Sequence, residues 1–350
     1  MHDIAGHQSS NHIEEPQGDH YLPPIAPAVG VAVDAAVPLP KSVRHVATPA
    51  VKTATSWQVV VWKLMPDATV GWALNSARER LDEAGCSTAR LDAQVILAHV
   101  LDVNRSWLFA HHDYRLNPEQ AEAFTNLIVR RMAHEPVAYL VGRREFYGLE
   151  FLVDQRVLIP RPETELLVDA VLDYAADMDT GRVVVADVGT GSGAIALSVA
   201  NHCPVAHIYA IDLSRAALEV AHSNVERLDS RGQVTLVQGD LLAPLPEAVH
   251  IIVANLPYIS SKVYPVLDVD VRDYEPQLAL EAGPEGLDAI KRLLQQSINY
   301  LHPDGAILLE IGYDQGEAVK MLARTFFPNA RLISLRQDYH GRDRLVTIIP

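Results

Sequence analysis

Apolar residues recur with a helical period over residues 67–135, and this spacing predicts a small all-helical domain. The first helix is expected to end just before Gly85, because glycine readily adopts the left-handed conformation that closes a helix. The third is expected to begin at Asn117, whose side chain can cap the N–H groups that follow it. The second is expected over 88–101, with a buried face formed by Leu91, Val95, Ala98 and Leu101.

A different pattern follows this helical region. Polar and apolar residues alternate over 145–159 around Gly148, which predicts a β-hairpin that links two domains. Strand and helix patterns then alternate, which indicates an α/β fold with a largely parallel sheet and helices on both faces. The expected strands lie at 183–188, 207–212, 234–238, 250–254, 306–311, 331–336 and 344–349.

The first part of the chain has neither period. Residues 1 to about 55 are rich in Pro, Ala, Val and His, and we expect them to be disordered. Their histidines are irregularly spaced, so we expect no metal site there. Periodic sequence begins just after Met65, which suggests Met65 as an ancestral translation start. The predicted divisions are a disordered extension over 1–65, a helical domain over 66–144, a linking hairpin over 145–160 and the α/β domain over 161–350.

Composition narrows the class of partner. The 350 residues carry a formal net charge of -15, which argues against the basic face that binding to phosphate backbones requires, so we expect no direct nucleic-acid partner. The two cysteines, Cys86 and Cys203, lack metal-ligand spacing and fit a reducing, cytoplasmic compartment. The sequence contains no run of 18 or more apolar residues, so we expect no membrane span.

A glycine-rich turn follows the strand expected at 183–188. It consists of Gly189, Thr190, Gly191, Ser192 and Gly193, and a helical pattern comes directly after it. Glycine allows the backbone to approach a ligand closely, and a helix N-terminus offers free N–H groups. The spacing is G-x-G-x-G, unlike the G-x-G-x-x-G of dinucleotide-binding folds. The turn favours ligand binding, and a merely tight strand–helix connection is the other interpretation.

Acidic residues end the next two expected strands. Asp212 can accept hydrogen bonds from both ribose hydroxyls of an adenosine ligand, or it could cap the helix that opens at Ser214. Asp240 and Leu241 follow the strand at 234–238, where an adenine would lie, although Asp240 could be a simple turn residue. NAD-dependent enzymes and S-adenosylmethionine-dependent enzymes share the ribose-binding acid.

Asn255-Leu256-Pro257-Tyr258 follows the strand at 250–254, which in a doubly wound sheet lies beside the strand at 183–188. The tetrapeptide should therefore face the glycine turn. An amide oxygen and a backbone carbonyl held by a rigid proline can accept both hydrogens of a substrate –NH2 group, and the tyrosine can stack on a planar amide or base. The other interpretation is a strand-ending turn.

Such a clamp suits methylation of a planar, poorly nucleophilic nitrogen. Orientation of the nitrogen supplies much of the acceleration, and the oxygen lone pairs favour the positive charge that develops on it. A strong general base is not required, because the methylated nitrogen becomes acidic and loses its proton afterwards.

With these motifs the chain resembles the release-factor glutamine methyltransferases, also called HemK or PrmC. The resemblance covers roughly residues 67–350 and is most specific over 135–168. It rests on "RLDAQVILAHVL", "EPVAYLVGRREFYGLEFLVDQRVLIPRPETELLV", "DVGTGSGAIALSVA", "NLPYI" and "EPQLALEAGPEGLDAIKRLL". It implies a seven-stranded class I methyltransferase (Rossmann-like) sheet with a small helical N-terminal domain that recognises the substrate. The implied reaction, which tunes translation termination, is methylation by S-adenosylmethionine of N5 of the glutamine in the Gly-Gly-Gln motif of peptide chain release factors.

The resemblance also implies roles for single residues. Asn255 and the carbonyl of Leu256 would hold the glutamine amide, with Pro257 and Tyr258 completing the catalytic and substrate-binding motif. The implied cofactor-binding residues are Gly189, Thr190, Gly191, Ser192, Gly193, Asp212, Asp240, Leu241 and Asn255.

One position departs from the family pattern. The family usually has Asn-Pro-Pro-Tyr, whereas Leu256 stands at the second position here. Asn-Leu-Pro-Tyr is also the form in ribosomal RNA adenine dimethyltransferases, so an adenine N6-methyltransferase acting on RNA or DNA is a rival hypothesis. A methyltransferase of a ribosomal-protein glutamine is another, and a non-catalytic adenosine-ligand sensor is a third.

Overall fold

The computed structural model describes residues 62–65, 67–229 and 231–350. Residues 1–61 of the disordered extension predicted over 1–65 lie outside the described residues. Among the helices that are described, none is both long and apolar enough to cross a membrane.

The helical domain begins with a helix whose buried face is the predicted one. Ala73, Ala77 and Leu81 are fully buried, and Gly85 follows with a φ of 82°. The Asn117 side chain accepts a hydrogen bond from the N–H of Gln120, whose side chain bonds back to the Asn117 N–H. This reciprocal capping box starts the fourth helix at the predicted residue. The helices are α1 (Val70–Glu83), α2 (Ala89–Leu101), α3 (Arg105–Ala110), α4 (Pro118–Met132) and α5 (Val137–Val141).

The buried face predicted for α2 is only partly right. Ala98 is buried as predicted, but Leu91 is 42% exposed, and the fully buried Ile96 and Leu97 were not predicted. The helix packs against α1, α3, α4 and α5, so it is enclosed on more than one side and has no single buried stripe. Its buried face also holds a carboxylate, because Asp92 is paired with the buried Arg131 at 2.7 Å.

The core of the helical domain includes residues that precede α1. Trp62 and Leu64 are 6% and 3% exposed and belong to the same hydrophobic cluster as Phe124. The Trp62 ring meets Phe124 edge-on, and its N–H donates to the Ser76 hydroxyl at 3.1 Å. Both residues fall within the extension predicted to reach residue 65.

A β-hairpin follows the helical domain. Strands β1 (Arg143–Phe146) and β2 (Leu149–Leu152) pair antiparallel. Tyr147 and Gly148 connect them with φ values of 51° and 74°, and two successive positive φ values are the mark of a tight two-residue hairpin turn.

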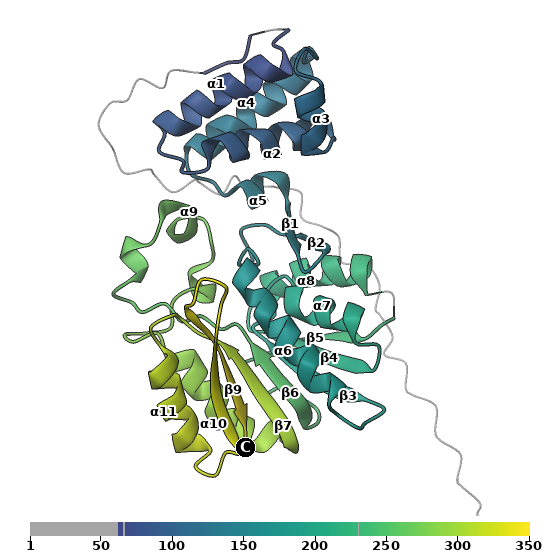
Figure 1. Cartoon of the computed structure of the whole chain (residues 1–350), viewed down its shortest axis with the longest axis vertical. Helices are drawn as coiled ribbons and strands as arrows, with labels where there is room; N and C mark the ends of the chain where they lie inside the picture. The colour runs from purple at the N-terminus through teal and green to yellow at the C-terminus, as the bar shows by residue number, and fades with distance from the viewer. Residues whose placement is uncertain (1–61, 66, 230) are drawn as a thin grey trace, which may run out of the picture. The chain divides into compact units, whose positions relative to one another are not determined.

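The rest of the chain forms a seven-stranded sheet with the order β5-β4-β3-β6-β7-β9-β8 (Figure 1). The strands from β5 to β7 pair in parallel, and β9 pairs antiparallel with both β7 and the edge strand β8. The predicted strands are confirmed, and β6 lies beside β3 as expected. The strands are β3 (Val183–Val188), β4 (Ala206–Asp212), β5 (Val234–Gln238), β6 (Val249–Ala254), β7 (Leu301–Glu310), β8 (Leu332–Gln337) and β9 (Asp343–Ile349).

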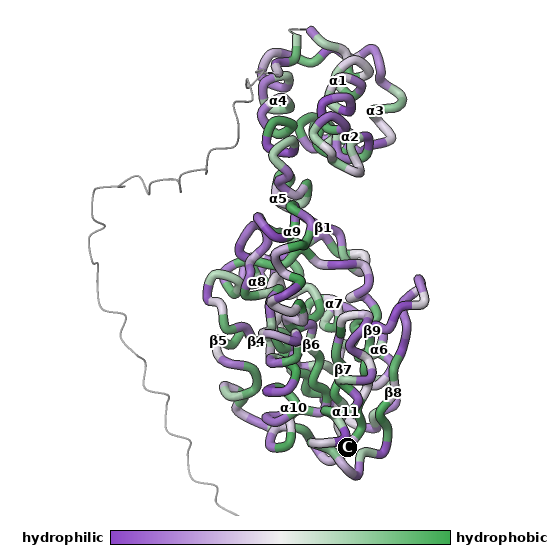
Figure 2. Tube along the Cα trace, turned by 90° about the vertical axis from the view of Figure 1, so that its left-hand side faces the viewer, coloured by the Kyte–Doolittle hydropathy of each residue, from purple (hydrophilic) through white to green (hydrophobic). Residues whose placement is uncertain are grey.

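Helices cover both faces of this sheet. Side chains of the central strands alternate between two hydrophobic clusters, so Val185 and Val253 lie in one cluster and Val184 and Ile252 in the other. In Figure 2 the central strands β6 and β7 run green, the colour of hydrophobic residues, as expected for strands covered on both sides. The larger helices are α6 (Glu165–Ala176), α7 (Ala194–His202), α8 (Arg215–Leu228), α10 (Asp288–Tyr300) and α11 (Gly316–Phe326).

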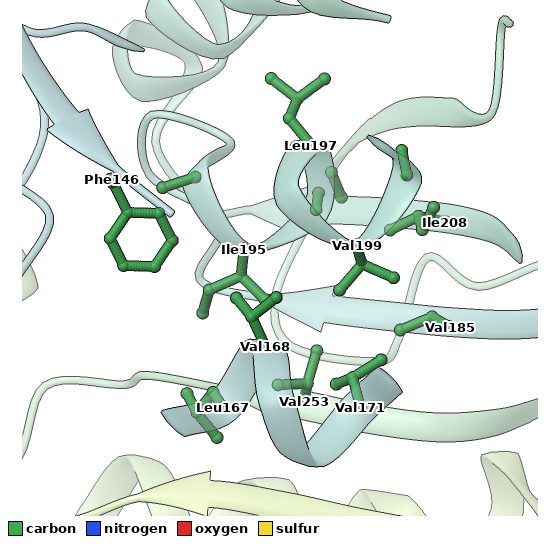
Figure 3. Packing of buried hydrophobic residues seen from close by; sticks show 14 of the residues in the cluster. Phe146, Leu167, Val168, Val171, Val185, Ile195, Leu197, Val199, Ile208 and Val253 are labelled. Carbon is green, nitrogen blue, oxygen red and sulfur yellow. The ribbon is translucent and has the colours of Figure 1, made fainter. Parts of the chain in front are cut away.

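Figure 3 shows the cluster on the first face, where Val168 and Val171 of α6 lie close to Val253 of β6. Helix α6 follows a short 3-10 turn, η1 (Pro162–Thr164). Packing of α6 on β6 therefore brings η1 to the end of that strand. The segment between β6 and α10 contains η2 (Tyr264–Val266), α9 (Val269–Arg272) and η3 (Gln277–Ala279).

Candidate functional site

Three neighbouring strands end in one row at the carboxyl edge of the sheet. Val188 of β3 pairs with Ala254 of β6, which pairs with Leu309 of β7. This is the edge at which parallel α/β sheets bind ligands. The next residues along the chain are Gly189 after β3, Asn255 after β6 and Glu310 at the end of β7.

A cavity of about 230 Å³ opens at this row. Most of the residues predicted from the sequence line it, whereas Gly193 and Tyr258 are absent from the described lining. The predicted residues that do line it are Gly189, Thr190, Gly191, Ser192, Asp212, Asp240, Leu241, Asn255, Leu256 and Pro257.

The glycine turn has a backbone that other residues rarely adopt. The φ values of Gly189, Gly191 and Gly193 are 76°, 56° and 82°. A Cβ atom on Gly189 would also lie 3.1 Å from Cδ2 of Leu256, so the turn and the tetrapeptide face each other. Gly193 instead packs away from the cavity, where a Cβ would lie 3.3 Å from Leu197.

The Asp212 carboxylate is held by backbone N–H groups. Gly191 N–H donates to Oδ2 at 2.9 Å, and Ser214 N–H donates to Oδ1 at 2.8 Å. Burial raises the pKa of Asp212, and these hydrogen bonds act in the opposite direction. The helix cap itself is Ser214, whose hydroxyl accepts from Ala217 N–H, so Asp212 retains acceptor capacity toward the cavity.

Asp187 is an acid that the sequence reasoning missed. It is fully buried, and its Oδ2 accepts from the Thr190 hydroxyl at 2.6 Å and from Ala196 N–H at 3.1 Å. Its Oδ1 is buried without a hydrogen-bond partner among the described residues. Burial raises the pKa of Asp187 to about 7, since the ionised form loses its hydration. The sequence feature that could have identified Asp187 is an acidic residue inside an apolar strand, two residues before the glycine turn.

Asp240 and Leu241 lie after β5 on the cavity wall. Asp240 forms an ion pair with Arg292 of α10, which also lines the cavity. Leu241 has a φ of 53°, a left-handed conformation that is uncommon for leucine and turns the chain at this point.

Asn255 is held by a residue far away in the sequence. Its Nδ2 donates to the Thr164 hydroxyl oxygen at 3.1 Å, and that hydroxyl donates to Oε2 of Glu310 at 2.7 Å. Thr164 and Glu310 are buried, with 4% and 3% exposure. Burial raises the pKa of Glu310 to about 7, opposed by the Thr164 hydrogen bond and by the charges of Arg344 and Arg161.

Tyr258 is held through its backbone. Gln315 Nε2 donates to the Tyr258 carbonyl at 3.0 Å, and a Cβ on Gly286 would collide with the same oxygen. Burial, followed by the nearby charge of Glu310, raises the pKa of the Tyr258 phenol to about 12. The phenol therefore stays protonated at neutral pH.

The sequence reasoning also missed cavity residues from two loops. Arg161 and Thr164 belong to the "LIPRPETE" run, which carries the family resemblance but received no role in the site. Leu278 comes from η3 and is 59% exposed although it lines the cavity. Among the described residues no group of three or more His, Cys, Asp or Glu side chains could hold a metal ion.

The arrangement combines a glycine turn, the Asp212 carboxylate and the anchored Asn255 amide around one cavity. Comparison with protein families finds two models that match the chain. The PrmC N-terminal domain matches residues 73–142, and the Methyltransferase small domain matches residues 163–267.

Individual relatives match over most of the chain. A release factor glutamine methyltransferase of Moorella thermoacetica is 45% identical over 279 residues, covering 79% of this chain and 96% of the relative. One of Bordetella pertussis is 42% identical over 258 residues, covering 73% of this chain and 93% of the relative. Among solved structures, a release factor-specific protein-(glutamine-N5) methyltransferase of Alicyclobacillus acidocaldarius is 30% identical, covers 57% of this chain and 100% of that chain, and has a TM-score of 0.36.

Proposed function

The chain belongs to the family of release factor glutamine methyltransferases, and from that premise we propose that it methylates N5 of the glutamine in the Gly-Gly-Gln motif of peptide chain release factors. The methyl donor in this proposal is S-adenosylmethionine. The observation that carries the proposal is the Asn255 amide, which is anchored through its nitrogen to Thr164 on the wall of the cavity that the glycine turn also lines.

The residues of the cavity fit the donor. The positive φ values at Gly189 and Gly191 let the backbone come close to a ligand. The Asp212 carboxylate suits a ribose diol, and Asp240 and Leu241 supply a polar and an apolar contact for an adenine.

S-adenosylmethionine supplies an electrophilic methyl group when it is bound. The chain's own contribution is to position the substrate nitrogen. Because Nδ2 of Asn255 is committed to Thr164, its Oδ1 is free to accept one N–H of the substrate amide. The backbone carbonyl of Leu256 can accept the other N–H. These two acceptors orient the nitrogen and favour the positive charge that grows on it, and the proton leaves once the new bond has formed.

The acceptor motif lacks a strong base, as this chemistry allows. The Tyr258 phenol has its pKa raised to about 12, so it is not a base at neutral pH. Leu256 in place of proline does not remove the carbonyl that the reaction uses.

The partner in this proposal is a protein, the release factor, and the helical domain over 66–144 is the part that recognises it. Translation termination takes place in the cytoplasm, which is therefore the proposed location. The rival adenine methyltransferase is disfavoured, because the net charge of -15 provides no general attraction for phosphate and the helical domain matches the PrmC N-terminal model.

The experiment is methyl transfer from labelled S-adenosylmethionine to a purified release factor, with mass spectrometry of the Gly-Gly-Gln peptide. A release factor in which that glutamine is replaced by alanine is the control and should take up no label. Ribosomal RNA, DNA and ribosomal proteins are offered in parallel reactions. Label on any of these, with none on the release factor, would contradict the proposed substrate.

A further inference from the structure

We propose that Thr164 and Glu310 are positioning residues that determine which end of the Asn255 amide faces the substrate. The inference deepens the proposed function and rests on it, because the direction of this amide matters only if Asn255 Oδ1 accepts a substrate N–H.

The direction follows from the donors and acceptors in the chain of hydrogen bonds. An ionised carboxylate is only an acceptor, so Glu310 requires the single proton of the Thr164 hydroxyl, which it receives at 2.7 Å. The Thr164 oxygen can then only accept from Asn255. Only the amide nitrogen can donate, so Nδ2 must face Thr164, at 3.1 Å, and Oδ1 must point the other way.

The fold keeps these three residues together. Asn255 and Glu310 follow residues that are paired in neighbouring parallel strands, β6 and β7, which lie side by side in Figure 1. Thr164 is the last residue of η1, which directly precedes α6. Because α6 packs on the face of the sheet formed by Val253 of β6 and Leu308 of β7, Thr164 lies near the ends of these two strands. Burial of Thr164 and Glu310 keeps water from replacing either partner, so the polarity of the chain is maintained.

Protonation of Glu310 would reverse this polarity. A neutral carboxyl group can donate to the Thr164 oxygen, and the threonine proton is then free to bond Asn255 Oδ1. The Asn255 amide would then turn its NH2 group toward the substrate. Two N–H donors would face each other, and the hydrogen bond from the substrate to Oδ1 would be lost. The pKa of Glu310 is about 7, with Thr164, Arg344 and Arg161 favouring the ionised form and Glu163 opposing it. We therefore expect methyl transfer at saturating cofactor to lose rate as the pH falls below about 7.

The test is a double-mutant cycle in single-turnover methyl transfer to a release factor, with cofactor saturating. Thr164→Val keeps the shape of the side chain and should slow transfer roughly ten- to a hundredfold, while the dissociation constant of the cofactor stays within about twofold. In the Asn255→Ala background the same change should have almost no further effect, because its target is gone. Thr164→Ser retains the hydroxyl and should restore most of the rate.

A matched control is Ser297→Ala in α10. Ser297 is also buried, it does not line the cavity, and its hydroxyl donates to a backbone carbonyl at 2.8 Å, so the loss of this buried hydroxyl should leave transfer unchanged. Glu310→Gln removes the titrating group, so the rate of this variant should not decline as the pH falls below about 7.

The outcomes separate this inference from the proposed function. If the wild-type protein fails to label the release factor, the proposed substrate is wrong. If it labels the release factor but Thr164→Val and Asn255→Ala multiply their effects, or Glu310→Gln keeps the acidic limb of the wild type, the positioning role is overturned.

Discussion

Gly189 and Leu256 face each other across the ends of β3 and β6, and a Cβ on the glycine would lie 3.1 Å from Cδ2 of the leucine. Leu256 is 5% exposed, so its side chain fills the space that the missing Cβ leaves free. The leucine at the position where the family usually has proline therefore packs against the glycine turn, while its backbone carbonyl remains available.

This contact predicts the effect of Gly189→Ala. The substitution should destabilise the protein by about 1–2 kcal/mol from the left-handed backbone, and more because the new methyl group crowds Leu256. It should also weaken cofactor binding, as measured by calorimetry. Gly85→Ala is the matched control, because Gly85 has a similar φ of 82° but nothing within 4 Å of the added Cβ. Equal losses in both variants would show that the contact with Leu256 does not matter.

Asp212→Ala should weaken S-adenosylmethionine binding. The carboxylate would lose one or two charge-assisted hydrogen bonds to the ribose, worth roughly 1.5–3 kcal/mol each. Part of any loss in affinity would be indirect. The substitution also removes the hydrogen bonds that the Gly191 and Ser214 N–H groups donate to the carboxylate in the unliganded protein. Unfolding of the unliganded variant measures that part separately. Unchanged cofactor affinity in calorimetry would remove Asp212 from the site.

Asp187→Asn should change how stability depends on pH. The folded pKa of about 7 lies above the ordinary value of 3.8, so the wild type loses stability as the pH rises from about 4 to about 7. Each unit corresponds to about 1.4 kcal/mol, so the loss is on the order of 4 kcal/mol in the unliganded protein. Asparagine does not titrate, and the variant should gain on the wild type over this range. Urea unfolding at about pH 5 and about pH 8 checks this, and a constant difference between the two proteins would contradict it.

Much of the fold could be predicted because the spacing of apolar residues within each strand or helix indicates its type and place. The period-2 and unbroken apolar runs located the strands to within a few residues, except for β7, which begins at Leu301 rather than at 306. The three short helices α3, α5 and α9 were missed, because six, five and four residues are too few to show a period. The partly wrong face of α2 has a physical cause, since a helix surrounded by four others buries several sides.

The site was less predictable for the same reason. Glycine, aspartate and the tetrapeptide stand next to strand ends, where sequence position alone implies a place at the sheet edge. Thr164 and Glu310 lie 91 and 55 residues from Asn255 in the sequence, so only the packing of α6 and the pairing of β7 bring them to it. Asp187 is similar, because its unpartnered oxygen is a property of the folded environment.

Trp62→Ala should destabilise the helical domain by about 3–5 kcal/mol, the usual loss for a buried tryptophan. Trp72→Ala is the matched control, because Trp72 is 41% exposed and its loss should matter far less. A chain that begins at Met65 would lack both Trp62 and Leu64 and should be destabilised as well. Thermal unfolding of the three proteins tests this, and an unchanged melting temperature for Trp62→Ala would show that the residue does not support the core.

Asn255→Ala should separate chemistry from binding. Turnover should fall roughly a hundredfold or more, the scale seen when one preorganised polar group is lost, because Oδ1 accepts the substrate N–H as charge develops. Cofactor affinity should change much less, since the residues proposed to contact the adenosine follow β4 and β5 on the cavity wall. Tyr258→Phe should be milder, because the ring remains. Single-turnover transfer to a release factor at saturating cofactor is the measurement. A near wild-type rate for Asn255→Ala would show that the amide is no clamp, and that Asn-Leu-Pro-Tyr only ends a strand.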